Sequence, residues 1–440
     1  MKIAIIGSGI AGLGAAHALR GQADITLFEA GDYFGGHTHT VDMTLPGLSG
    51  PVTHGVDTGF LVFNERTYPQ LIKLFADLQV PTERSDMSFS VQVPGGHGRT
   101  PLEWSGSSLN TVFAQRRNLV NPRFLRMLRD VTRFNRLATG IANRGAEAEL
   151  MQPLGGFLAQ NGLSDEFRDW YFLPMLGCIW SCPTDQMLQF PVATMIRFCH
   201  NHGLIQVTDR PQWHTVRGGA KHYVEKLLAR IPDARLNTPV TAVRRLPPGQ
   251  GQAGVMVHTA AGEERFDEVV MACHSDQTLA LLADATPGER SVLGAIGYHP
   301  NRAVLHTDAS VMPQRRRAWA AWNYERAPET QREQSAVCLH YWLNRLQPLP
   351  WDKPVIVSLN PARPIAPQTI VGEWNYSHPV FDLAAIEAQR RLPQIQGRSH
   401  VWYCGAWTRY GFHEDGLSSA LEVASSLLAR WQAEPARAAA

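Results

Sequence analysis

The sequence of 440 residues has little cysteine, little lysine and no long apolar run. Its six cysteines are spaced irregularly, which is typical of free thiols rather than of a disulfide framework. No stretch reaches the roughly 18 uninterrupted apolar residues that a membrane-spanning helix needs. The 41 basic and 39 acidic residues nearly cancel, so the chain has no net field for binding nucleic acid. Only five of the basic residues are lysine, and none lies between residues 227 and 352.

The amino-acid composition, with 44% hydrophobic residues, 12 Trp and 17 His, is that of an ordinary globular protein. A chain of this length predicts two or three domains. The histidines at 37, 39, 200 and 202 do not complete a four-ligand set, so we predict no metal site. The amino terminus resembles a secretory signal, but repeated glycines interrupt it. We therefore expect a cytoplasmic protein and leave open a peripheral contact with the inner membrane surface.

A dinucleotide-binding pattern occupies the first thirty residues. Lys2–Ile6 is a short β-branched run, the glycine-rich turn 7–12 follows, and a second apolar run at 24–28 ends in Glu29. Gly7 permits the tight turn, Gly9 lets the backbone approach a pyrophosphate, and Gly12 allows close packing of helix on strand. The helix N-terminus then faces the phosphates with unpaired N–H groups. Glu29 is placed to accept hydrogen bonds from the ribose diol of an adenosine.

The loop after Glu29 narrows the identity of the cofactor. It has the sequence AGDYFGGH over residues 30–37, and VDTGF follows at 56–60. With the Gly-Gly segment at 213–223 and CGAWTRYGFHEDGL at 404–417, these stretches resemble the flavin amine oxidase and phytoene desaturase superfamily. They are most similar to the flavoproteins associated with cyclopropane fatty acid synthases. The resemblance implies FAD as the cofactor, held non-covalently because the covalent cysteine motif of some relatives is absent.

The resemblance also implies which residues hold FAD. Two arginines that relatives carry in the Gly-Gly loop are replaced here by Tyr33 and His37, so helix dipole and backbone amides must do more of the phosphate binding. A helix expected from Ser418 to Ala429 would point the N–H groups of Gly416, Leu417 and Ser418 at the flavin. The expected FAD-binding residues are Gly7, Gly9, Ile10, Ala11, Gly12, Glu29, Ala30, Gly35, Gly36, His37, Asp57, Gly59, Val240, Gly405, Ala406, Gly416 and Leu417.

The predicted fold is α/β, with a Rossmann-like FAD-binding domain of three-layer ββα architecture and an α+β substrate domain, both discontinuous. Residues 1–70, 205–290 and 395–432 are assigned to the FAD-binding domain. Residues 71–204 and 291–394 are assigned to the substrate-binding domain, and 433–440 to a disordered tail. Eight of the 12 tryptophans fall in the two substrate segments, as they would in the wall of a large apolar pocket.

Catalysis is assigned to the stretch before the last helix. We predict His413 as proton acceptor, with Glu414 or Asp415 orienting it, the alternative being that either acid only caps the helix. Amine oxidases usually carry a lysine near the flavin where this chain has Asn301 or Arg302, and arginine cannot act as a base. The predicted pocket side chains are Tyr298, Trp322, Tyr341, Tyr410 and Phe412.

Three reactions remain open at this point. The first is FAD-dependent hydride abstraction from a hydrophobic substrate, desaturating or oxidising a modified fatty acyl chain. The second is oxidation of a primary or secondary amine, and the third is flavin-dependent isomerisation without net redox change. The expected partner is a hydrophobic small molecule or lipid, with no nucleic acid and no transmembrane segment, and the sequence does not identify the electron acceptor.

Overall fold

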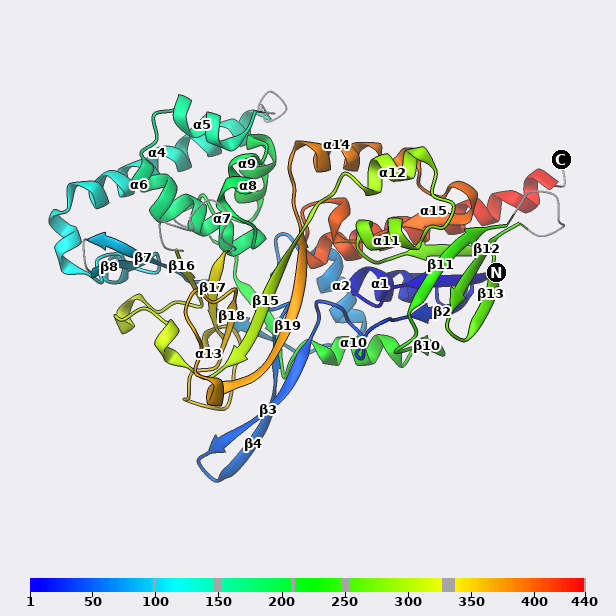
Figure 1. Cartoon of the computed structure of the whole chain (residues 1–440), viewed down its shortest axis with the longest axis horizontal. Helices are drawn as coiled ribbons and strands as arrows, with labels where there is room; N and C mark the ends of the chain where they lie inside the picture. Colours follow the sequence, from blue (N-terminus) through cyan, green and yellow to red (C-terminus); the bar gives the residue numbers. More distant parts are fainter. Residues whose placement is uncertain (98–99, 146–151, 207–209, 247–252, 327–336, 439–440) are drawn as a thin grey trace.

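The computed structural model describes residues 1–97, 100–145, 152–206, 210–246, 253–326 and 337–438. Its first sheet has five strands, all parallel, in the order β10-β2-β1-β14-β20. These strands come from three distant stretches of the chain and lie in the right half of Figure 1. Their bounds are Asp233–Arg235, Asp24–Phe28, Lys2–Ile6, Glu268–Met271 and Val401–Tyr403.

The alternation of side chains along β1 shows why this sheet has a layer on each face. Ile3 and Ile5 belong to the main core together with α1 (Ile10–Leu19). Ala4 and Ile6 belong to a second core, together with residues of an antiparallel sheet in the order β11-β12-β13. Successive side chains of a strand point to opposite faces, so one short apolar strand serves both layers. The bounds of the three antiparallel strands are Val240–Arg245, Val255–Thr259 and Gly262–Phe266.

Helices cover the other face of the parallel sheet. The longest, α15 (His413–Ala438), packs along α1, and α10 (Lys221–Leu228) contacts α1 as well. The fold is therefore α/β with helix, parallel sheet and antiparallel sheet in three layers, as predicted. Residues 433–438, which the sequence assigned to a disordered tail, are drawn as the last turns of α15.

A second large sheet has seven strands in the order β19-β15-β18-β17-β16-β7-β8. It lies in the left half of Figure 1, and the long strands β15 and β19 extend from it toward the parallel sheet. All of its strand pairs are antiparallel except β16 with β7. Its strands are Ile370–Pro379, Tyr298–His306, Ile356–Leu359, Cys338–Trp342, Trp322–Glu325, Phe89–His97 and Thr100–Ser105.

Several helices pack beside the seven-stranded sheet. The longest of them, α4 (Pro122–Arg144), begins at a proline whose missing N–H is not needed there, and ends at Gly145 in the left-handed conformation. Beside it, α9 (Val192–Asn201) packs against α4, and α7 (Leu173–Trp180) packs against β16. Other helices here are α3 (Leu109–Val112), α5 (Leu154–Gln160), α6 (Asp165–Phe167) and α8 (Thr184–Leu188).

Two small sheets and further helices join these halves. The hairpin of β3 (Thr40–Gly47) and β4 (Gly50–Asp57) projects from the body at the bottom of Figure 1. β9 (Trp213–Val216) pairs with β5 (Phe63–Asn64) and with β6 (Thr82–Ser85), so one small sheet crosses the predicted boundary at residue 70. The remaining helices are α2 (Pro69–Asp77), α11 (Ser275–Leu281), α12 (Pro287–Leu293), α13 (Leu343–Leu346) and α14 (Leu383–Arg391).

The division into two discontinuous domains stays a proposal at the boundaries given above. Every strand of the two large sheets falls in the segment to which the sequence assigned it. Among the helices that the structure describes, none is both long enough and apolar enough to cross a bilayer.

Candidate functional site

A cavity of about 680 Å³ runs from the carboxyl ends of the parallel strands to the seven-stranded sheet and its helices. One end is lined by the glycine-rich turn, and the other by apolar side chains of α7, α9 and β16. A position outside the carboxyl ends of parallel strands is where open α/β sheets bind their ligands.

Each glycine of the glycine-rich turn has a different structural role. Gly7 has φ +101°, which residues with a side chain rarely adopt. A Cβ atom on Gly12 would lie 1.8 Å from the carbonyl oxygen of Gly7, so Gly12 packs behind the turn and not in the cavity. Gly9 lines the cavity, and a Cβ atom there would have no protein atom within 4 Å. The backbone at Gly9 is thus bare on the side where a pyrophosphate would approach.

Glu29 connects this turn to the loop that follows the second strand. Its carboxylate accepts hydrogen bonds from the backbone N–H and hydroxyl of Ser8 and from the N–H of Gly31, at 2.8 Å for Gly31. The Ser8 hydroxyl in turn accepts from the N–H of Gly35. A carboxylate has about four acceptor positions, so Glu29 keeps about one of them for a hydroxyl of a ribose. The predicted residues Ile10, Ala11, Ala30, Gly35, Gly36, Gly59, Val240, Gly405 and Ala406 also line the cavity.

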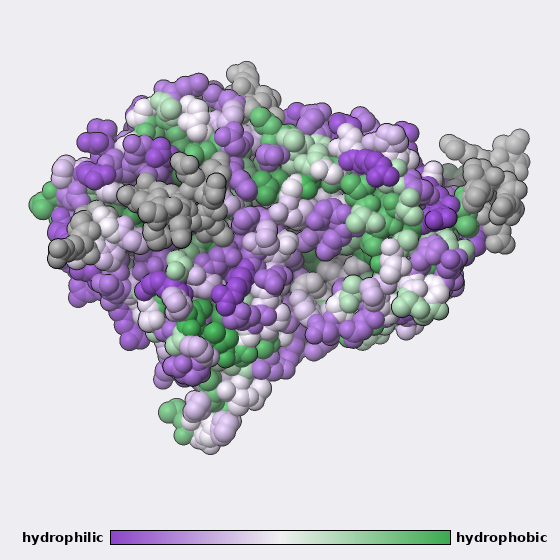
Figure 2. Space-filling model, viewed as in Figure 1, coloured by the Kyte–Doolittle hydropathy of each residue, from purple (hydrophilic) through white to green (hydrophobic). Residues whose placement is uncertain are grey.

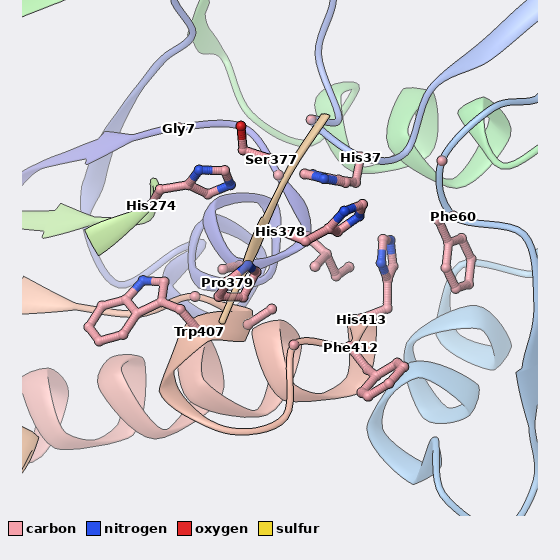
Figure 3. Close-up of a pocket in the computed structure, with 18 of the residues that line it drawn as sticks. Gly7, His37, Phe60, His274, Ser377, His378, Pro379, Trp407, Phe412 and His413 are labelled. Atoms are coloured by element: carbon pink, nitrogen blue, oxygen red, sulfur yellow. The ribbon is translucent and has the colours of Figure 1, made fainter. Parts of the chain in front are cut away.

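Histidines gather in the middle of the cavity (Figure 3), where the rings of His37, His378 and His413 lie close together. His37 is partly buried, and its Nε2 atom is buried without a hydrogen-bond partner. Burial, reinforced by neighbouring His378 and His274, holds the pKa of His37 well below its usual value. His37 is therefore a neutral side chain and does not supply a counter-charge for phosphate.

His378 was not predicted from the sequence, and the asparagine at the expected lysine position holds it. The Nδ2 atom of buried Asn301 lies 3.0 Å from Nδ1 of His378. Because Asn301 also donates to the carbonyl of His299 and accepts from Asn360, its amide orientation is fixed. An amide nitrogen only donates, so Nδ1 accepts and the ring hydrogen of His378 is on Nε2. Burial lowers the pKa of His378 to about 4.

Arg302, the other candidate for the lysine position, points away from this histidine. Its guanidinium forms two hydrogen bonds with Glu373 at 2.7 and 2.9 Å, and both side chains are exposed. It takes no part in lining the cavity.

His413 lies beside two hydroxyl groups instead of the predicted carboxylates. Its Nε2 atom is 2.8 Å from the Thr38 hydroxyl and 3.0 Å from the Tyr223 hydroxyl, and these two hydroxyls also bond to each other. The ring stacks on Phe60 at a centroid distance of 3.8 Å. Burial lowers the pKa of His413 to about 3, so the ring is neutral.

The two acids after His413 do not orient it, and this part of the prediction is wrong. Glu414 accepts hydrogen bonds from the N–H groups of Gln70 and Leu71 at 2.8 and 3.0 Å and so caps α2. Asp415 accepts from the N–H groups of Tyr410 and Phe412 and so fixes the turn that enters α15. Burial raises the pKa of Asp415 to about 6.

The helix start also corrects two predicted cofactor contacts. Because α15 begins at His413, the N–H of Gly416 donates to the carbonyl of Phe412 inside the helix. A Cβ atom on Gly416 would meet Ile10 at 2.9 Å, and one on Gly14 would meet Leu417 at 2.7 Å. Gly416 and Leu417 thus pack α15 against α1 and do not line the cavity.

Asp57, like Gly12, is a further predicted cofactor residue outside the cavity. Its buried carboxylate accepts hydrogen bonds from the N–H of Ala220, from the Thr40 hydroxyl and from the Gln347 amide. These contacts fix the turn that opens α10, and Asp57 does not line the cavity. Burial raises its pKa to about 7, although the three donors favour the charged form.

The cavity is lined by four of the five predicted pocket residues: Trp322, Tyr341 and Phe412 at the apolar end, and Tyr298, which stacks on His274 near the glycine-rich turn. Tyr410 is the exception, because it lies behind this wall, its backbone carbonyl accepting a hydrogen bond from Trp180. Of the eight tryptophans in the predicted substrate segments, Trp322 alone lines the cavity among the described residues, so most of that excess is core packing. Other wall residues that the sequence did not indicate are Phe60, Met87, Ile179, Phe198, Leu204 and Trp213.

The cavity carries almost no formal charge. Among the described residues that line it, Glu29 is the one carboxylate, and neither lysine nor arginine is present. Burial lowers the pKa of each lining histidine, to about 4 for His202. The apolar end is therefore neutral at physiological pH.

Comparison with known proteins agrees with this geometry. A family model described as flavin containing amine oxidoreductase matches residues 10–307, which is more than half of the chain. The chain belongs to the flavin-containing amine oxidoreductase family. It is accordingly an FAD-dependent oxidoreductase, and no curated protein matches it significantly.

Solved structures of similar fold include members with different substrates in their titles. A CLA-producing fatty acid isomerase from P. acnes has a TM-score of 0.66 and 18% identity, over 96% of this chain and 98% of that one. Cyclohexylamine oxidase from Brevibacterium oxydans IH-35A has a TM-score of 0.65 and 17% identity, over 98% and 99%. Putrescine oxidase bound to putrescine has a TM-score of 0.64 and 15% identity, over 98% and 99%. At these identities the likeness concerns the fold.

The residues of this oxidoreductase fit FAD in their chemistry. The open backbone at Gly9, the carboxylate of Glu29 and the ring of His37 all line one continuous cavity. Gly7, Ser8, Ala30, Val240, Gly405 and Ala406 complete the set that would hold the cofactor.

One group of possible metal ligands lies elsewhere in the oxidoreductase. Within the part of the chain that the structure describes, Glu325, Cys338 and His340 have their ligand atoms within 4.8 Å of one another. Arg363 forms a salt bridge with Glu325 at 3.0 Å, and the three residues do not line the cavity. The group is a buried polar network of the seven-stranded sheet.

Proposed function

We propose that this oxidoreductase removes hydrogen from a neutral hydrophobic substrate, and that the substrate is a fatty acyl chain which it desaturates or oxidises. The observation that carries the proposal is the apolar end of the cavity, which has aromatic and aliphatic walls and no ionised side chain among the described residues. The fatty acid isomerase of similar fold and the resemblance to flavoproteins that accompany cyclopropane fatty acid synthases support an acyl chain.

In this proposal the two ends of the cavity have separate roles, one in binding FAD and the other in binding the substrate. FAD bound at the glycine-rich turn would supply the hydride acceptor. The walls formed by Phe60, Trp322 and Phe412 would exclude water and hold the chain. We propose His413 as the proton acceptor, with Thr38 and Tyr223 passing the proton onward. These two hydroxyls take the place of the carboxylates predicted from the sequence.

We further propose that FAD is held non-covalently. Two cysteines, Cys178 and Cys273, line the cavity, and covalent attachment through sulfur needs a reactive thiolate. Burial raises the pKa of Cys178 well above its usual value and that of Cys273 to about 11, so both stay protonated thiols. Acid precipitation of the purified protein should release all of the yellow chromophore into the supernatant.

Amine oxidation remains the second candidate because cyclohexylamine and putrescine oxidases share the fold. A protonated amine, however, would enter a compartment without a carboxylate and lose its hydration there. Purified, FAD-loaded protein should be mixed anaerobically with phospholipid acyl chains and, separately, with a panel of amines. Flavin bleaching by the acyl chains supports the proposal, whereas bleaching by amines alone, with peroxide release in air, would contradict it. Conversion of an acyl chain to a positional isomer without bleaching would show isomerisation instead.

A further inference from the structure

One surface of the molecule combines exposed arginines with exposed apolar side chains. It is formed by α3, by the short helix η1 (Arg116–Val120) and by α4, and we refer to it as the arginine surface. Residues 109–136, which make it up, contain seven arginines and a single acidic residue, Asp130. The same residues carry none of the proposed FAD or substrate contacts.

The helix α4 places its arginines on one side. Phe124, Met127 and Phe134 are buried toward the core. The exposed positions recur at intervals of three and four residues, which is the period of one helix face. They include the five arginines Arg123, Arg126, Arg129, Arg133 and Arg136.

Few carboxylates neutralise this face. Glu166 reaches Arg123 at 2.7 Å and Arg126 at 3.8 Å, so one buried acid serves two arginines. Asp130 is buried and lies 3.7 Å from Arg129. Arg133 donates to the carbonyl of Gly162, which carries no charge. On η1, the guanidinium groups of Arg116 and Arg117 bond to neutral oxygens of Asn110, Phe113 and Thr100. The surface therefore keeps a net positive charge.

Apolar side chains protrude at the amino-terminal end of the same surface. Eight large hydrophobic residues are exposed in the part of the chain that the structure describes, and four of them fall between 109 and 125. They are Leu109, Leu119, Val120 and Leu125, with exposed fractions of 79%, 52%, 82% and 42%. The end of the molecule where Figure 1 draws α4 and β8 is mostly hydrophilic in Figure 2, with separate hydrophobic spots.

We propose that the arginine surface binds the face of an anionic phospholipid bilayer. Arginine pairs with phosphate through several N–H groups at once, and isolated apolar side chains beside it can enter the headgroup region. Acidic side chains alone would satisfy the arginines but not the protruding leucines and Val120, whereas an anionic bilayer offers phosphate and an apolar layer together. The helix behind this surface, α9, contributes Phe198 to the apolar end of the cavity, so docking would place the bilayer on the side of the substrate compartment.

The test is vesicle binding by the full-length, FAD-loaded protein. Sedimentation should show binding to vesicles of phosphatidylglycerol mixed with phosphatidylcholine, little binding to phosphatidylcholine alone, and weaker binding as salt rises. The variant Arg129→Gln/Arg133→Gln/Arg136→Gln should lose roughly tenfold or more in affinity. The matched control Arg244→Gln/Arg390→Gln/Arg398→Gln removes three exposed arginines elsewhere and should bind like the parent protein.

A second variant tests the apolar part. Leu119→Ser/Val120→Ser should weaken vesicle binding while leaving its salt dependence unchanged, because the arginines remain. Thermal melting and flavin content of every variant show whether each one is folded. Equal binding to neutral vesicles, or unchanged binding of the triple arginine variant, would overturn the proposal, and so would capture of an acidic protein without any vesicle binding. Since the readout is binding alone, the result does not depend on which substrate the enzyme oxidises.

Discussion

At the scale of single residues, the site depends on buried neutral groups. His37, His378 and His413 all have a lowered pKa because burial disfavours their charged forms. Each has a different set of contacts: an unpartnered nitrogen for His37, the Asn301 amide for His378, and two hydroxyls for His413. Because of these contacts the three rings differ in their hydrogen bonding, although all three are neutral.

The hydroxyl of Tyr223 provides the most selective test of the proton path. Tyr223→Phe keeps the buried ring and removes one of the two hydroxyls bonded to His413. If protons leave the site through this hydroxyl, the rate of flavin reduction should fall about tenfold to a hundredfold with unchanged flavin content. Tyr403→Phe, which removes a buried hydroxyl bonded to Glu289 outside the cavity, is the control. Stopped-flow rates equal to those of the parent protein would exclude Tyr223 from the path.

Asp57 makes stability depend on pH. Burial raises its pKa in the folded protein to about 7, above the value near 3.8 of an exposed aspartate. The protonated form is thus favoured by folding, so this contribution to stability is complete below about pH 4 and is lost as pH rises through 7. The free energy of unfolding of the parent, relative to Asp57→Asn, should fall by on the order of 2 kcal/mol between pH 5.5 and 8. Parallel curves for the two proteins in urea denaturation would contradict the shift.

At the scale of helices and strands, α15 and α2 are linked by a cap contributed from a distant part of the sequence. The carboxylate of Glu414 bonds to the N–H groups of Gln70 and Leu71 in the first turn of α2, which is the position where a negative charge stabilises a helix. Glu414→Ala should therefore reduce the free energy of unfolding by about 1–2 kcal/mol. Glu422→Ala, on the exposed face of α15, should cost about 0.5 kcal/mol or less.

Thermal unfolding of both variants measures this difference, and flavin content gives the second readout. A catalytic role of Glu414 would instead leave stability unchanged and lower the rate of flavin reduction, which is the outcome that would restore the acid as an orienter of His413.

At the scale of the whole molecule, the sequence predicted the layers better than the contacts. β1 has five residues with a regular alternation, and its turn uses Gly7 and Gly9 in ways that local geometry requires. These features depend on neighbouring residues and could be predicted. Asp57, Glu414 and Asp415 were misassigned because their partners lie up to 344 residues away, or in a turn whose shape depends on where α15 begins.

His378 was missed for a related reason. It lies on β19, 77 residues from Asn301, and only the pairing of β15 with β19 brings the two together. The absence of lysine from residues 227–352 directed attention to Asn301 and Arg302, but could not show that Asn301 would bond to His378.

The central claim is that the substrate compartment accepts a neutral chain. The most direct measurement compares anaerobic flavin reduction by three compounds with the same long alkyl chain: a neutral ester, the free carboxylate and the primary amine. Because the apolar end lacks a counter-charge for either ion among the described residues, the ester should reduce the flavin at least tenfold faster than the other two. Faster reduction by the amine would contradict this account and favour amine oxidation.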